Sequence, residues 1–189
     1  MEQKLRVEFP ENLRLELKEA YLDQLVLRPG DDVMVNELND SEAVGRIRSM
    51  CFDCAKGKVK VEVQWYYKPK DTGDMKLKKQ CSEIELFLSD SFIELELGCI
   101  DGKVRILSLE EIIDLDEIED DTFFTRARWI TLEQKLDPPL VKWKRGCVCE
   151  EIINPDKPFK VCTNCKMFLH VDCLPKTGEQ KCPQCEEVL

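Results

Sequence analysis

The stretch from Gly146 to Leu189 constrains the fold more than any other part of the chain. It holds eight side chains of the kinds that bind zinc, with the spacing C-x1-C-x12-C-x2-C-x4-H-x2-C-x8-C-x2-C. In chain order they are Cys147, Cys149, Cys162, Cys165, His170, Cys173, Cys182 and Cys185. Two thiolates this close in sequence can reach one Zn²⁺, and a tetrahedral site takes four such ligands. The pattern therefore predicts two closed structural zinc sites, with no open position for catalysis.

His170 is the only histidine in the chain, and the metal-type spacing on both sides favours a ligand over a solvated side chain. Disulfides explain the cysteines less well, because C-x-C and C-x-x-C pairs are too close for ordinary bridges and no secretory context is present. A stretch this short cannot bury a core of its own, so the metal ions are expected to supply its folding energy. Replacing one ligand, as in Cys162→Ala, is then expected to unfold this stretch and leave the larger domain folded.

The whole chain has 189 residues and a net charge of −10, which fits one medium domain and one small one. Its acidic residues are concentrated between Glu83 and Asp121, and such a surface favours a basic partner. We find no basic stripe, so direct binding to DNA is not expected. No apolar run is long enough for a membrane span, and the first twenty residues do not form a signal peptide, so no membrane partner is expected.

Period-two alternation of apolar and polar residues indicates a strand-rich fold before the cysteine-rich stretch. One short helix is expected to begin at the capping box formed by Ser108 and Glu111. We expect strands near residues 5–9, 13–17, 25–27, 33–35, 44–50, 59–67, 85–90, 93–97, 103–107 and 123–129.

The strand over residues 59–67 carries two aromatic residues on one face. Val61, Val63, Trp65 and Tyr67 alternate with polar residues, so Trp65 and Tyr67 project in the same direction at the end of the strand. They either fill the core, which the alternation alone favours, or form two walls of an aromatic cage for a quaternary ammonium group.

Four segments resemble landmarks of the bromo-adjacent homology (BAH) domain, in the order and approximate spacing of that family: residues 27–35, 63–69, 85–90 and 123–126. The order of the zinc-type ligands, four Cys, one His and three Cys, resembles that of a PHD finger. Over nearly its full length, the chain is similar to plant BAH–PHD chromatin readers. This resemblance implies a mainly β, partly barrel-like BAH domain with short helices at residues 20–140, followed by a small cross-brace two-zinc finger at residues 141–189. Residues 1–19 are expected to form an N-terminal β extension or hairpin.

The resemblance also implies which side chains bind what. One Zn²⁺ would be held by Cys147, Cys149, His170 and Cys173, and the other by Cys162, Cys165, Cys182 and Cys185. A methylated lysine would meet Trp65 and Tyr67 in the BAH domain. In the finger, Phe168 matches a peptide-binding position, Phe159 is the further aromatic residue that could complete a cage, and Gly146 stands where readers of trimethylated lysine 4 carry an aromatic residue.

The function implied is that of a nuclear, non-catalytic reader or adaptor. It would bind histone H3 tails or the nucleosome, with trimethylated lysine 27 favoured, and help to recruit or hold a histone-modifying or silencing complex. Two alternatives stay open. A scaffold subunit with degenerate pockets is favoured by Ala43, Val44 and Ser91, which occupy positions where further cage residues are usual. A RING-like ubiquitin-ligase module is suggested by Cys182-Pro183-Gln184-Cys185, although no catalytic constellation appears elsewhere.

Overall fold

The computed structural model describes residues 13–36, 42–115, 117–176 and 178–189. The strand expected near residues 5–9, and with it most of the N-terminal extension, lies outside these ranges. The chain forms two compact units. The first comprises the described residues up to Tyr67, with Leu88–Ile106 and Asp120–Thr122; the second comprises Lys68–Phe87, Leu107–Glu119 and Phe123–Leu189.

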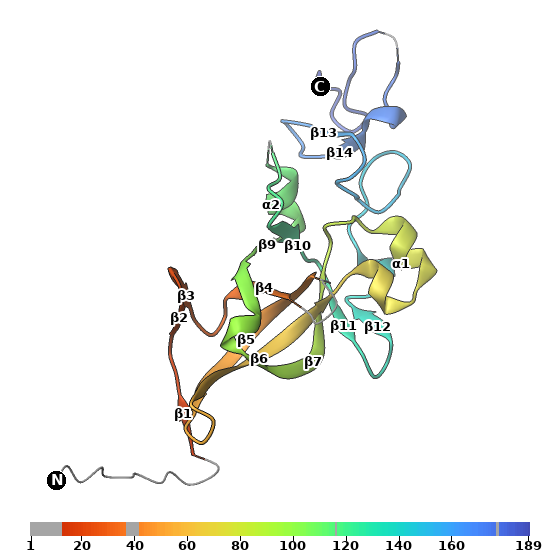
Figure 1. Cartoon of the computed structure of the whole chain (residues 1–189). Coiled ribbons are helices and arrows are strands. Elements are labelled where there is room, and N and C mark those ends of the chain that lie inside the picture. Colours follow the sequence, from red (N-terminus) through yellow and green to blue (C-terminus); the bar gives the residue numbers. More distant parts are fainter. Residues whose placement is uncertain (1–12, 37–41, 116, 177) are drawn as a thin grey trace, which may run out of the picture. The chain divides into compact units, whose positions relative to one another are not determined.

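A sheet of long strands forms the first unit (Figure 1). Neighbouring strands follow the order β7-β6-β5-β4-β8, and β1 pairs with the far end of β5. The pairs β4–β5, β5–β6 and β4–β8 are antiparallel. The bounds are β1 Arg14–Glu16, β4 Asp32–Asn36, β5 Glu42–Asp53, β6 Lys58–Tyr67, β7 Phe87–Glu96 and β8 Ile100–Lys103. A 3₁₀ turn, η2 (Leu97–Cys99), joins β7 to β8, and β2 (Ala20–Leu22) pairs with β3 (Leu25–Leu27) in a separate hairpin.

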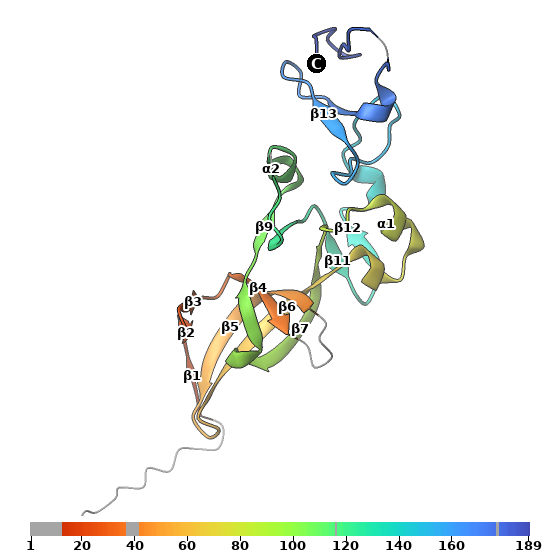
Figure 2. The same ribbon diagram turned by 45° about the horizontal axis from the view of Figure 1, so that its top comes forward.

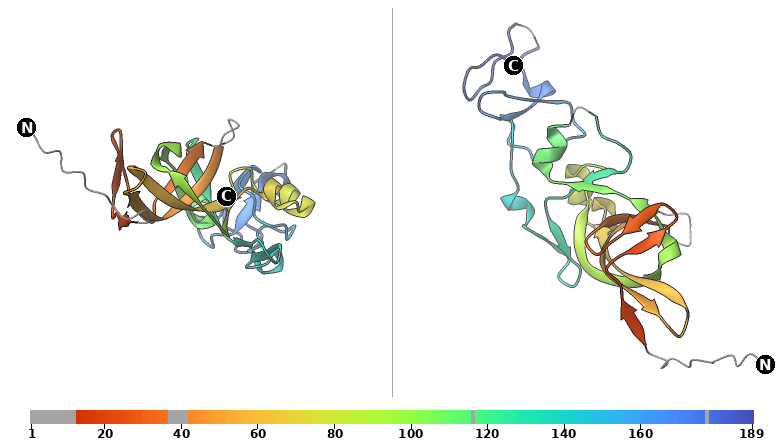
Figure 3. Two further views of the ribbon diagram at one scale, coloured as in Figure 1. Left: turned by 60° about the horizontal axis from the view of Figure 1, so that its bottom comes forward. Right: turned by 90° about the vertical axis from the view of Figure 1, so that its left-hand side faces the viewer.

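The core of the first unit comes from the alternating residues of these strands. Every second residue of a strand points to the same face, so the apolar set of β4, β5 and β6 meets on one side of the long hairpin drawn in orange and yellow in Figure 3. The fully buried members are Val33, Val35, Ile47, Met50, Val61 and Val63, and Leu27 of β3 packs in the same cluster. The strands expected at residues 13–17, 25–27, 33–35, 44–50 and 59–67 are therefore confirmed, and β7 unites the two short strands expected at residues 85–90 and 93–97. The single strand expected at residues 103–107 is wrong, because the chain breaks at Val104 between β8 and β9 (Arg105–Leu107).

The opposite face of β6 is partly buried as well, which the alternation did not indicate. Gln64 is buried and its amide donates to the carbonyl of Ser89 on β7. The phenol of Tyr66 is buried too and donates to a carboxylate oxygen of Asp32 at 3.0 Å, while Arg46 binds both oxygens of Asp32 at 2.8 and 2.9 Å. These polar side chains are tolerated inside because each has a hydrogen-bond partner.

The second unit is built from short elements (Figure 2). They are η1 Pro69–Thr72, α1 Met75–Gln80, α2 Leu109–Ile113, β11 Arg128–Ile130, β12 Lys135–Asp137, η3 Leu140–Lys142, β13 Phe159–Val161, β14 Phe168–His170 and η4 Val171–Cys173. The strands β11 and β12 form one antiparallel hairpin, and β13 and β14 form another. The paired strands β9 (Arg105–Leu107) and β10 (Thr122–Phe124) have residues in both units.

Both helices have defined starts. Ser108 caps α2 as expected: its hydroxyl accepts from the Glu111 N–H at 3.2 Å, and the Glu111 carboxylate accepts from the Ser108 N–H at 2.8 Å. Helix α1 was not expected from the sequence. Asp74 caps it by accepting from the Lys76 N–H at 2.7 Å, and Leu77 is its one buried residue. A helix with one buried residue has no repeating apolar pattern from which it could be predicted.

The single strand expected over residues 123–129 is wrong, because the chain forms β10 and β11 with a break between them. Thr125 closes the break by donating its hydroxyl hydrogen to the carbonyl of Ala127 at 3.2 Å. Arg126 turns inward at this point toward the buried carboxylate of Glu85. In the ranges that the structure describes, no helix has the length and apolarity to cross a lipid bilayer.

Candidate metal centres

The eight metal-type ligands lie around the β13–β14 hairpin and the loops beside it. His170 is the last residue of β14 and Cys173 is the last residue of η4. The N–H of Cys147 donates to the carbonyl of Phe168 at 2.7 Å, and the N–H of Cys162 donates to the carbonyl of Met167 at 2.9 Å. The first bond ties the loop of Cys147 to β14, and the second closes the loop between Cys162 and the residue before β14.

Three of the close cysteine pairs end in the same turn. Lys166 follows Cys165, and Glu186 follows Cys185; their φ values are 58° and 62°, and their N–H groups donate to the carbonyls of Cys162 and Cys182 at 2.9 and 2.8 Å. Glu150 repeats the turn after Cys149, with φ of 55° and a 3.4 Å bond to the carbonyl of Cys147. The residue with positive φ reverses the chain direction in each loop, so that the two thiols of a pair face the same ligand group. These turns carry no glycine, so they could not be predicted from the sequence.

The first group consists of Cys147, Cys149, His170 and Cys173, whose potential ligand atoms all lie within 4.8 Å of one another. The Nδ1 atom of His170 lies 3.3 Å from the sulfur of Cys149, and the His170 N–H donates to the sulfur of Cys147 at 3.4 Å. Nδ1 is therefore the ring nitrogen that faces the thiols. Nε2 is buried and has no hydrogen-bond partner in the described part of the chain.

The second group consists of Cys162, Cys165, Cys182 and Cys185, again with all sulfurs within 4.8 Å. The Cys162 and Cys185 sulfurs are 3.5 Å apart, as are those of Cys165 and Cys182. Four sulfurs at tetrahedral Zn–S bond lengths would be roughly 3.8 Å apart, so the donors fit a four-coordinate metal. The two groups interleave along the chain, and they are the same two sets that the resemblance to a PHD finger implies.

The surroundings of two thiols favour the deprotonated form that a metal needs. Burial opposes ionisation of Cys147, but hydrogen bonds from the backbone of Cys149 and His170 outweigh it and lower the pKa of this thiol to about 6. The backbone N–H of Cys165 is the main cause that lowers the pKa of Cys162 to about 7. A hydrogen bond to Cys147 raises the pKa of Cys173 to about 12, because it stabilises the protonated thiol.

The finger shares a hydrophobic core with the rest of the second unit. Ile153 and Phe168, from the cysteine-rich stretch, pack in one buried cluster with Leu107, Leu109, Ile112 and Phe124. Phe159 stacks on Phe168 with ring centroids 4.6 Å apart, and the rings of Phe168 and His170 are perpendicular with centroids 5.2 Å apart. A Cβ at Gly146 would lie 3.0 Å from Phe168 and 3.1 Å from Ile153, so any larger residue here requires these two side chains to shift.

Arg126 is a structural residue that the sequence did not reveal. Its guanidinium binds both carboxylate oxygens of Glu85 at 2.6 and 2.7 Å and donates to the carbonyl of Ile153 at 2.8 Å. It also lies over the ring of Trp143, with the guanidinium carbon 4.3 Å from the centroid. The Glu85 side chain is fully buried and that of Arg126 is 9% exposed. The pairing depends on residues far apart in sequence, so no local pattern could have indicated it.

Trp65 and Tyr67 lie at the end of β6, in the first unit. Both are half-buried, and Trp65 packs against the hydrophobic core of that unit. Gly45 pairs with Trp65 across the sheet; a Cβ there would meet Val63 at 2.1 Å and the indole at 3.4 Å. Glycine on β5 therefore makes room for side chains of β6. This packing supports a structural role for Trp65 and leaves part of each aromatic side chain accessible.

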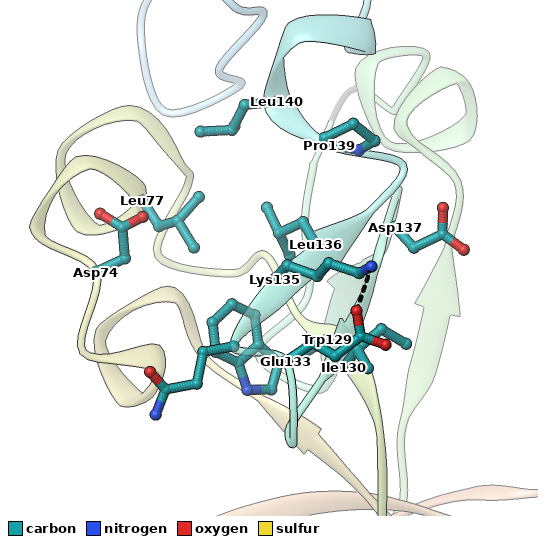
Figure 4. Close-up of a pocket in the computed structure, with 11 residues that line it drawn as sticks. Asp74, Leu77, Trp129, Ile130, Glu133, Lys135, Leu136, Asp137, Pro139 and Leu140 are labelled. Atoms are coloured by element: carbon teal, nitrogen blue, oxygen red, sulfur yellow. Dashed lines mark ion pairs between the residues drawn. The ribbon is translucent and has the colours of Figure 1, made fainter.

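A surface cavity of about 630 Å³ opens beside α1 in the second unit. Figure 4 shows Leu77 from α1 facing Trp129 and Leu136 from the β11–β12 hairpin, with Leu140 and Pro139 above them. Glu133 and Lys135 form an ion pair on its rim. The cavity contains none of the residues predicted to bind a peptide or a metal.

A family model for the BAH domain matches residues 25–139, and the chain belongs to this family. Curated relatives extend the match into the cysteine-rich stretch. The chain is 30% identical over 156 residues to "Chromatin remodeling protein SHL" of Arabidopsis thaliana, covering 82% of this chain and 67% of the relative. It is 27% identical over 157 residues to "Chromatin remodeling protein EBS" of the same plant, covering 82% of this chain and 65% of the relative.

Among solved structures, the yeast Rsc2 BAH domain has a similar fold. The TM-score is 0.50 at 16% sequence identity, and the match covers 65% of this chain and 53% of the Rsc2 chain. At this identity the likeness concerns the fold alone. It confirms the mainly β, BAH-type architecture that the sequence predicts.

Proposed function

We propose that this protein is a nuclear, non-catalytic chromatin reader or adaptor that binds the tail of histone H3 and joins a larger chromatin-modifying complex. One observation carries the proposal: a BAH domain and two interleaved metal-ligand groups occur in one chain whose relatives are named chromatin remodeling proteins. The acidic net charge of −10 supports a basic partner such as a histone tail.

The finger is proposed to hold two structural Zn²⁺ ions. Thiolate and imidazole donors in sets of four are the ligands of closed zinc sites, and the distances between donors suit tetrahedral coordination. Zinc would supply folding energy for the loops that carry the ligands. Because all four positions of each site are filled by protein, the metal would perform no reaction.

Trp65 and Tyr67 are the proposed contacts for a methylated lysine, with trimethylated lysine 27 of histone H3 favoured. Two half-buried aromatic rings at the end of one strand can meet a quaternary ammonium through cation–π attraction. In the finger, β13 belongs to a two-stranded sheet with β14, so a peptide can add as a further strand along residues 158–161. Phe159 and Phe168 would support that strand through their stacked rings.

The test is a titration of the metal-loaded protein against unmodified and methylated H3 and H4 peptides. We expect selective binding of an H3 peptide trimethylated at lysine 27. Trp65→Ala should weaken it about tenfold or more, since a desolvated cation–π contact contributes up to about 2 kcal/mol. Tyr21→Ala is the matched control, because Tyr21 is an exposed aromatic residue of the same unit.

A scaffold role is the second candidate, and the packing of Trp65 against the core favours it. Two results together would support the scaffold role over the histone-reader role. The protein without substitutions would bind none of the peptides, and Trp65→Ala would lose much of its thermal stability. Retention of peptide binding in Trp65→Ala would remove the proposed cage but leave histone binding in place.

A further inference from the structure

A concentration of lysines interrupts the acidic surface of the chain. Residues 68–79, which form η1 and α1 in the second unit, contain five lysines and two aspartates. In the part of the chain that the structure describes, no ion pair joins any of these lysines to a carboxylate. They are Lys68, Lys70, Lys76, Lys78 and Lys79, and all but the half-buried Lys68 are exposed.

The two aspartates in this segment face the backbone. Asp71 accepts from the Lys68 N–H at 3.2 Å, and Asp74 accepts from the Lys76 N–H at 2.7 Å. Elsewhere, cations such as Lys58 and Lys103 are neutralised by carboxylates at 2.8 Å. With five lysines and two aspartates, the segment keeps a net charge of +3 in a chain whose net charge is −10.

The lysines surround a concave surface rather than a flat one. A cavity of about 360 Å³ is lined by Lys68, Lys70 and Lys78, and Glu83 is the one acidic residue on its wall. Lys79, next along α1, lines a second cavity of about 310 Å³ with Arg145 and Lys157, and Glu150 and Glu151 are the acidic residues on its wall. Four of the five lysines therefore line concave surfaces, and Lys76 lies on the same helix as Lys78 and Lys79.

The composition of the segment points to the class of anion that fits. Residues 68–79 contain no aromatic side chain, so they offer no surface on which unpaired bases could stack. They also contain no arginine, whose planar guanidinium is the best suited group for paired hydrogen bonds to guanine. Flexible ammonium groups suit phosphate oxygens contacted without regard to sequence.

We propose that the η1–α1 lysine cluster, defined as Lys68, Lys70, Lys76, Lys78 and Lys79, binds the phosphate backbone of duplex DNA. The proposal goes beyond histone binding and does not depend on it. It differs from the expectation drawn from the sequence, where the net charge of −10 concealed a short basic segment. A protein that holds a histone peptide would gain a second, sequence-independent contact with the same nucleosome.

The experiment measures binding of the full chain to a fluorescent random-sequence duplex of about 20 base pairs by anisotropy, over a range of salt concentrations. We expect non-specific affinity of about 1–100 μM at physiological salt. Three to five phosphate contacts predict a slope of log K against log salt of about −3 to −4.5. The variant Lys70→Gln/Lys78→Gln/Lys79→Gln should lose about tenfold or more in affinity at low salt, and its slope should become shallower by about two to three.

The matched control is Lys18→Gln/Lys56→Gln/Lys176→Gln, which changes the net charge equally at exposed lysines outside the cluster. The proposal predicts less than a twofold change for this control. Equal losses in both triple variants would overturn it, because only net charge would then matter. No duplex binding at about 50 mM salt, equal binding of single-stranded DNA, or complete competition by a poly-glutamate peptide at the same charge concentration would each overturn it too.

Discussion

At the scale of single residues, the interaction of Arg126 with Glu85 is the most consequential polar contact in the second unit. A buried carboxylate without its cation would remain charged in a poor solvent or take up a proton, and both are costly. The same guanidinium donates to the carbonyl of Ile153, which belongs to the cysteine-rich stretch. One side chain therefore links the residues around Glu85 to the finger within this unit.

Replacing Arg126 with Met should lower the free energy of unfolding by about 3–5 kcal/mol, because Glu85 loses its only ion pair among the described residues. Urea unfolding followed by fluorescence would measure this. Arg128→Met is the control, since Arg128 is exposed on β11, and it should cost less than about 0.5 kcal/mol.

Adding Glu85→Leu to Arg126→Met should restore part of the lost stability, because the uncompensated carboxylate is removed. A double variant as unstable as Arg126→Met would show that the lost contacts with Ile153 and Trp143, rather than the buried charge, account for the effect.

Single residues also show which parts of the candidate metal and peptide sites can be predicted from the sequence. The eight ligands were identified from spacing alone because metal chemistry fixes both the kind of residue and its separation. No comparable rule of residue type and spacing applies to Arg126, Gln64 and Tyr66. Each is polar or amphipathic, and its burial depends on a partner from a distant strand or loop. The cage residues Trp65 and Tyr67 stay a prediction, because aromatic residues at the end of a strand serve packing and binding equally well.

At the scale of secondary-structure elements, the long strands and the short strands β1 and β3 were predictable, whereas most short elements of the second unit were not. The strands β4, β5 and β6 alternate clearly, since one of their faces is buried over most of its length. The break between β10 and β11 arises where Arg126 turns toward Glu85, which overrides the local preference of a β-rich run. The helix α1 is held by a cap and one leucine, too little for a periodic signal.

Removing the metal should affect α2 as well as the finger. From sequence alone, the finger is expected to unfold by itself, but Ile153 and Phe168 share a buried cluster with Leu109 and Ile112 of α2. Hydrogen exchange after chelation should therefore show loss of protection at residues 109–113 together with the finger, while β5 and β6 keep theirs.

The comparison that decides this prediction is between α2 and the β5–β6 pair in the same chelated sample. Full protection of α2 in metal-free protein would mean that the cluster survives without the finger. Loss of protection in β5 and β6 to the same extent would mean that the whole chain unfolds in one step.

At the scale of the whole molecule, the compact units differ from the domains predicted at residues 20–140 and 141–189. Residues of the BAH family match, such as Leu107 and Phe124, pack with residues of the finger inside the second unit. The boundary at residue 140 is what the resemblance to BAH–PHD readers implies. Contacts between residues on the two sides of a boundary produce no local sequence pattern, so the predicted boundary still has to be tested.

A chain that stops at residue 140 provides that test. It lacks Ile153, Phe168 and Trp143, so it should expose the apolar side chains of Leu107, Leu109, Ile112 and Phe124. We expect it to bind the dye ANS strongly and to elute partly as aggregates in size-exclusion chromatography, whereas the full chain does neither. A truncated chain that is monomeric, free of dye binding and as heat-stable as the full protein would establish residues 20–140 as an independent domain.

The contact of Ile153 and Phe168 with the cluster around α2 also limits how this protein can be re-engineered. Chromatin-binding modules are often treated as interchangeable parts, to be joined by recombination or by design. Here a grafted finger would have to reproduce two apolar anchors and the backbone carbonyl that receives Arg126. A donor chosen only for its ligand spacing would bind its metal and still leave its host incomplete.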